Sequence, residues 1–169
     1  MAKRIIWGVV FMLIAALLQS TVFSRLAFYI HAVPDMALII LVFTAYVNGT
    51  MTGQLSGFFS GVLLDFLSAS PLGLNALIRT LIGALTGLLK GTFFLDLFFL
   101  PMALCAGATA VKAMIYFLLH LLLAGAVPSY SVFGPTLWVE LGLNTVLAPF
   151  LFGFLKLFGT MLVKQSEES

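Results

Sequence analysis

The chain has 169 residues, of which 62% are apolar and 8% are charged. Soluble domains are roughly 45–50% apolar and about 25% charged, so this composition excludes an ordinary water-soluble domain. A helix needs about 20 apolar residues to cross a bilayer, and this chain has enough of them for about five or six such spans. The net charge of +2 is small and scattered, which argues against a nucleic-acid-binding surface. The sequence therefore predicts an all-α polytopic membrane protein that lies in the lipid bilayer.

Six spans are expected, and they form a single compact transmembrane domain over residues 1–163, followed by a short polar tail at 164–169. The second span opens with Pro34 and Asp35, because proline suits a first helical turn and an acidic residue suits the positive end of the helix dipole. Residues 24–34 and 92–100 are expected to lie at the membrane interface. The predicted spans are about 5–23, 34–47, 52–67, 74–90, 101–124 and 137–163.

An even number of spans places both termini on one side of the membrane. That side holds Lys3, Arg4, Lys90 and Lys164, whereas the predicted loops on the opposite side hold only Arg25. Loops on the cytoplasmic side carry an excess of Lys and Arg. Both termini are therefore predicted to be cytoplasmic.

Glycines recur at every fourth position in the third and fourth spans. This spacing keeps them on one face of each helix, where small residues let two backbones approach closely in lipid. In an antiparallel hairpin centred on Leu72, position 53 is expected to face 91, 57 to face 87, and 61 to face 83. The predicted packing seam consists of Gly53, Gly57, Gly61, Gly83, Gly87 and Gly91.

The same register places Asp65 opposite Arg79 at a similar depth. A charge inside the bilayer costs several kcal/mol, so an ion pair between these two residues is the expected remedy. Such a pair either only fastens the hairpin or also lines a binding surface. The sequence leaves both interpretations open.

Polar side chains also recur on the last two spans. Lys112, Tyr116 and His120 share one face of the fifth span, and Glu140 and Asn144 share one face of the sixth. With Asp65 and Arg79 they make a balanced set of charges, which favours an internal polar network over an ion pathway. A proton relay through His120 and Glu140 is a weaker alternative, since no acidic residues continue across to the cytoplasmic side.

Motifs of enzymes and of cofactor or metal sites are absent from the sequence. It has no phosphate-binding glycine loop ending in Lys-Ser or Lys-Thr, no His-Glu-x-x-His and no Gly-x-Ser-x-Gly. Its one cysteine, Cys105, lies in an apolar run and is expected to act as a small buried hydrophobe. We expect no enzymatic activity, no cofactor and no bound metal.

The run GQLSGFFSGVLLDFLSASPLGLNAL, which begins at Gly53 and includes Asp65 and Asn75, resembles the signature region of the rod shape-determining protein MreD family. The run LQST at 18–21 and the pair Pro34-Asp35 look like that family too. The resemblance implies an inner-membrane component of the bacterial cell-elongation machinery, which inserts peptidoglycan into the side wall. It also implies MreC, a bitopic protein, as a partner, with the MreB filament and a wall-synthesis polymerase and transpeptidase in the wider complex. The implied fold is similar to that of the substrate-binding subunits of energy-coupling-factor transporters.

Three functions are compared on this basis. The first is a non-enzymatic membrane scaffold, which the short loops and small-residue faces favour. The second is the substrate-binding membrane subunit of a vitamin transporter, which would hold a small solute near the outer face. The third, an ion-coupled transporter, lacks a transmembrane acidic relay. The residues expected to form the polar network or to contact a partner are Asp65, Asn75, Arg79, Lys112, His120, Glu140 and Asn144.

Overall fold

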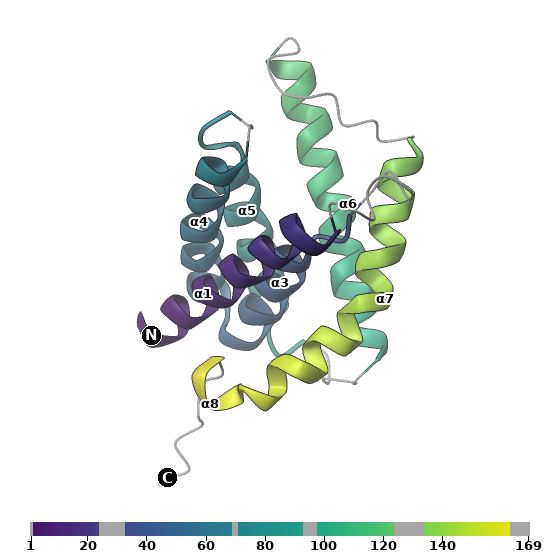
Figure 1. Cartoon of the computed structure of the whole chain (residues 1–169). Coiled ribbons are helices and arrows are strands. Elements are labelled where there is room, and N and C mark those ends of the chain that lie inside the picture. The colour runs from purple at the N-terminus through teal and green to yellow at the C-terminus, as the bar shows by residue number, and fades with distance from the viewer. Residues whose placement is uncertain (1, 24–32, 69–70, 93–97, 124–133, 163–169) are drawn as a thin grey trace.

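The structure is a computed structural model of the chain, and it describes residues 2–23, 33–68, 71–92, 98–123 and 134–162. Helices make up almost all of these residues, and no strand occurs among them, which confirms the all-α prediction (Figure 1). Each of the six predicted spans overlaps one helix of 13 to 24 residues, and the last predicted span also includes the short helix α8. The elements are α1 (Ala2–Leu18), the short π-helical turn η1 (Gln19–Phe23), α3 (Met36–Asn48), α4 (Thr50–Leu67), α5 (Leu74–Leu88), α6 (Phe99–Leu122), α7 (Pro135–Leu157) and α8 (Gly159–Leu162).

The helices have the length and composition of a membrane bundle. Three apolar stretches of the described chain are long enough to cross a membrane, namely Ala2–Thr21, α6 and α7, while α3 and α5 are apolar but shorter. Pro149 lies inside α7, and this helix curves along its length in Figure 1. Most of the expected interfacial segments, the tail at 164–169, and with them Arg25 and Lys164, lie outside the described residues.

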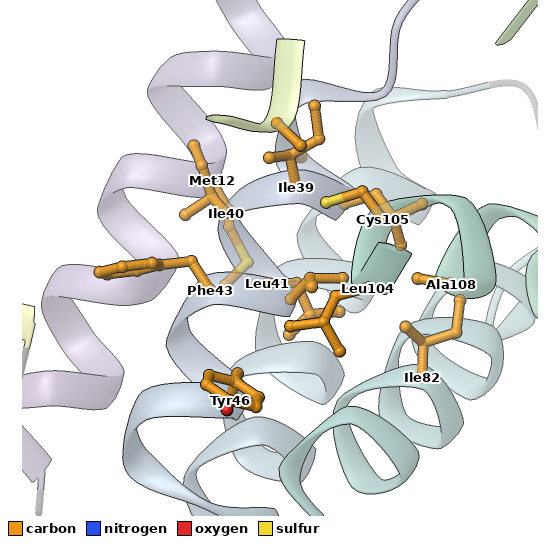
Figure 2. Close-up of a cluster of buried hydrophobic side chains, with 14 of the residues drawn as sticks. Met12, Ile39, Ile40, Leu41, Phe43, Tyr46, Ile82, Leu104, Cys105 and Ala108 are labelled. Atoms are coloured by element: carbon orange, nitrogen blue, oxygen red, sulfur yellow. The ribbon is translucent and has the colours of Figure 1, made fainter. Parts of the chain in front are cut away.

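Helix α3 forms the centre of the bundle. Every residue from Ala37 to Tyr46 is buried, with at most 4% of its surface exposed. A helix that is apolar all round is expected in such a position, and α3 contacts α1, α4, α5, α6 and α7. Figure 2 shows its side chains packed against Met12 of α1, Ile82 of α5 and Cys105 of α6, so the buried thiol is part of the apolar core as expected.

Helices α4 and α5 pack with their backbones in direct contact along the predicted glycine faces. A Cβ atom added to Gly57 would collide with the carbonyl group of Arg79, and one added to Gly53 would collide with the carbonyl group of Gly83. A Cβ on Gly87 would lie 2.5 Å from the Cα of Thr50. Five of the six predicted glycines thus lie in this interface. Gly91 does not, because it lies in the turn after α5 with φ of 75° and nothing within 4 Å of an added Cβ.

The predicted register of this hairpin is wrong by about two helical turns. Gly53 faces Gly83 instead of Gly91, and Gly61 faces Ala76 instead of Gly83. The prediction requires that each residue before and after Leu72 advances by the same distance along the hairpin axis. However, α4 ends at Leu67 and α5 begins at Leu74, and a non-helical residue spans up to about 3.5 Å against 1.5 Å in a helix. The connection therefore returns past the end of α4, and α5 begins beside the last turns of α4.

Replacement of Gly57 by Ala tests this interface. Backbone atoms of α5 already occupy the position that the added methyl group would take. We therefore expect a loss of roughly 1–3 kcal/mol in the free energy of unfolding, measured by denaturation in detergent. Gly107→Ala is the matched control, since a Cβ at Gly107 of α6 meets nothing within 4 Å. Equal stability of the two variants would contradict the close packing of α4 on α5.

Candidate functional site: a buried ionic cluster

The site centres on Asp35, which caps the N-terminus of α3. Its side chain accepts a hydrogen bond from the backbone N–H of Leu38 at 2.9 Å. The Nη2 of Arg79 on α5 donates to both carboxylate oxygens, at 2.9 and 3.1 Å. The Nζ of Lys112 on α6 donates to the same carboxylate at 2.8 Å. Asp35 therefore joins α3, α5 and α6 at one point.

Helix α7 adds a second acid to this cluster. Lys112 Nζ also donates to Glu140 Oε1 at 2.7 Å, so the lysine bridges the two carboxylates. The side chains of Asp35, Arg79, Lys112 and Glu140 are 7–15% exposed. The long, flexible side chain of Lys112 lets its ammonium group reach both carboxylates.

Neutral groups extend the cluster deeper between α6 and α7. Asn144 is fully buried, and its Oδ1 accepts from the backbone N–H of Asp35 at 2.8 Å. Its Nδ2 donates to the Thr109 hydroxyl at 3.0 Å, and Thr109 donates to the Cys105 carbonyl at 2.8 Å. Asn144 thus satisfies backbone and hydroxyl groups rather than Lys112.

The predicted ion pair between Asp65 and Arg79 is wrong, because Arg79 pairs with Asp35. Asp65 instead caps α5 from across the hairpin. Its carboxylate accepts from the backbone N–H groups of Gly73, Asn75 and Ala76 at 2.9–3.2 Å, and from the Asn75 side chain at 3.0 Å. The first turn of a helix has free N–H groups and a positive dipole end, so it stabilises a buried carboxylate.

Sequence reasoning missed the central role of Asp35. The positive dipole end at the start of α3 is enough to account for an acid at this position, so the sequence pattern does not mark Asp35 as a partner for a buried cation. The available signal was an acid directly before an unbroken apolar helix, at the same end of the bundle as Arg79 and Glu140. Pro34 lies one residue before the cap rather than in the first turn, because Asp35 itself takes the cap position.

Tyr116 and His120 continue the polar face of α6 beyond Lys112, one and two turns further on. Both side chains are half-buried, and His120 lies in the last turn of α6. No three His, Cys, Asp or Glu residues of the described chain are grouped so as to hold a metal ion. Both carboxylates of the cluster are already bound by Arg79 or Lys112.

The ionic cluster links helices to one another. Two carboxylates and two cations balance in charge, and each ion has an opposite partner within 3 Å. Buried ions are tolerated in a membrane protein when they pair in this way. Together they join α3, α5, α6 and α7 through contacts between side chains that lie far apart in the sequence.

The fold and site define a helical membrane protein whose bundle is locked by a buried ionic cluster. A family model described as rod shape-determining protein MreD matches residues 2–158. The chain therefore belongs to the MreD family, a family of structural, shape-determining proteins, and is a membrane component that determines rod shape. Comparison with curated proteins and with solved structures gives no match, so the likeness to transporter subunits stays a prediction.

A double-mutant cycle distinguishes the observed ion pair from the one predicted. Asp35→Asn should cost about 3–5 kcal/mol of unfolding free energy, because it leaves Arg79 buried without a counter-charge. Arg79→Met should cost less in the Asp35→Asn background than alone, which gives a coupling energy of about 1–3 kcal/mol. The same cycle for Asp65→Asn with Arg79→Met should show coupling below about 0.5 kcal/mol. Strong coupling to Asp65 and none to Asp35 would reverse the assignment.

Proposed function

We propose that this protein is a multi-pass scaffold of the bacterial inner membrane that organises side-wall peptidoglycan synthesis by binding the transmembrane helix of MreC. Family membership supports the role in cell shape. The observation that carries helix binding is an apolar groove of about 390 Å³ between α5 and α6. The MreB filament and the wall-synthesis polymerase and transpeptidase join this assembly directly or through MreC.

The groove has the composition of a helix-docking surface in lipid. Leu85 and Leu88 on α5 form one wall and are 48% and 67% exposed. Ala103 and Gly107 on α6 form the other wall, four residues apart, and a Cβ at Gly107 would meet nothing within 4 Å. Small residues at this spacing allow close approach of a second helix, and packing contacts drive helix association in membranes.

Both termini are proposed to lie on the cytoplasmic side. The support comes from Asn48, at the end of α3, which binds residues of both the first helix, α1, and the last helix, α8. Arg4 donates to Asn48 Oδ1 at 3.1 Å, and Asn48 Nδ2 donates to the Leu162 carbonyl at 2.6 Å. Lys90 donates to the Asn48 carbonyl at 3.3 Å, so basic residues collect at this end of the bundle. The positive-inside rule assigns such an end to the cytoplasm.

Reporter fusions test this orientation. Fusions at Ser166 and after Gly91 should report a cytoplasmic location, and a fusion at Ser129 should report the periplasm, because the Lys and Arg bias fixes the inner end. Enzymatic reporters active on only one side of the membrane give the readout. A periplasmic signal from Ser166 would contradict the proposed topology.

The docking groove is tested by Gly107→Leu, with Gly142→Leu on α7 as the matched control. A Cβ meets nothing within 4 Å at either glycine, so both variants should accumulate normally. The leucine at 107 fills the groove, and we expect it to reduce co-purification of MreC by roughly tenfold, which corresponds to about 1.4 kcal/mol. The control should retain MreC.

The same two variants are then expressed in a rod-shaped host depleted of its own copy of this protein. Gly107→Leu should give rounded cells, whereas Gly142→Leu should restore the rod shape. Normal MreC binding and rod shape with Gly107→Leu would exclude the α5–α6 groove as the docking surface.

A further inference from the structure

A cavity of about 380 Å³ opens at the outer end of the bundle, between the end of α1, the start of α3, the end of α4 and α5. It differs from the apolar grooves because it reaches the ionic cluster: both Asp35 and Arg79 line it. The rest of the lining is mixed. Leu17, Leu64 and Leu67 supply apolar surface, whereas Gln19, Ser20 and Ser68 supply polar groups.

Arg79 has more donors than the protein satisfies. Its Nη2 makes both hydrogen bonds to Asp35. Its Nη1 is buried and has no acceptor among the described residues. A buried charged donor without a partner is costly, and most such groups in proteins are satisfied by the protein, by water or by a ligand. Because Arg79 also lines the cavity, a molecule held there is placed to supply the acceptor that its guanidinium lacks.

The charges of the cluster indicate what kind of acceptor fits. Asp35 and Glu140 already balance Arg79 and Lys112. An added anion would lie beside the Asp35 carboxylate and leave the site with a net negative charge, which is unfavourable at low dielectric. An uncharged oxygen acceptor satisfies the guanidinium without that cost. The leucines around it require that the acceptor be carried on an apolar molecule.

We propose that this cavity is a lipid-binding site in which an ester carbonyl of a membrane glycerolipid accepts a hydrogen bond from Arg79. The ester groups of such lipids lie at the boundary between head groups and hydrocarbon. The cavity has the matching depth, since it is lined by Leu64 and Leu67 in the last turn of α4 and by Asp35, which precedes α3. The acyl chain lies along Leu17, Leu64 and Leu67, and the polar head group faces Gln19, Ser20 and Ser68.

The test is a competition between two lipids that share head group and chain length but differ in linkage. The full chain is purified, stripped of lipid and mixed with equal amounts of a diester and a diether phosphatidylethanolamine, and native mass spectrometry gives the ratio bound. The ether lipid lacks the carbonyl acceptor, and a hydrogen bond to a charged donor is worth roughly tenfold in affinity or more. We expect the diester lipid to be preferred by roughly tenfold.

Two variants show whether this preference arises in the cavity. Arg79→Lys keeps a cation for Asp35 but lacks the guanidinium, and Ala16→Phe fills the cavity without changing the ion pair, since Ala16 lines it. Both should remove the preference for the diester lipid. Ala103→Phe is the control, because it fills the α5–α6 groove instead, and it should leave the preference unchanged.

Equal binding of the two lipids by the wild-type protein would overturn the proposal, as would a preference that persists in Ala16→Phe. If the Arg79→Lys variant does not fold, the Ala16→Phe variant alone decides the test. MreC is absent from this experiment, so its outcome is independent of the proposed helix docking.

Discussion

Asp35 receives hydrogen bonds from two buried cations and from the first turn of its own helix, and the positions of the other helices depend on this one carboxylate. Arg79 and Lys112 cannot remain in hydrocarbon without an opposite charge. Helices α5 and α6 must therefore approach the N-terminal end of α3, and Lys112 also binds Glu140 of α7. Apolar contacts in lipid do not select a particular partner helix. These ion pairs specify which helices meet and in what register along the bundle.

The glycine seam holds together the α4–α5 hairpin, whereas the ion pairs join α5 to α3, α6 and α7. It fixes α4 on α5 by backbone contact, with no side chain between them at Gly53, Gly57 and Gly83. The rigid hairpin then positions Arg79 toward α3, because Arg79 lies on the face of α5 next to this seam. The glycine contacts and the ion pairs together fix how the described helices are arranged.

Much of the fold could be predicted because its signals are local. Apolar runs interrupted by Gly and Pro gave the six long helices, and glycine spacing gave the faces on which α4 and α5 pack. The pairing of charges could not be predicted, since it depends on the path of a short connection. A register error of two turns moved Arg79 away from Asp65. Local sequence signals favour Asp35 as a helix cap only, and they do not show that Asp65 binds the N–H groups at the start of α5.

The order of the four ions along the chain matters while the protein is being made. Asp35 and Arg79 both lie in the part of the chain that ends with α5, the fourth of the six long helices, so a nascent chain of that length is already neutral at this site. Lys112 then enters the bilayer before Glu140, which follows 28 residues later. At about 5–20 residues per second, the ribosome supplies that acid within roughly 1–6 seconds. During this delay Asp35 can hold the lysine, so a shared carboxylate makes stepwise insertion into the membrane possible.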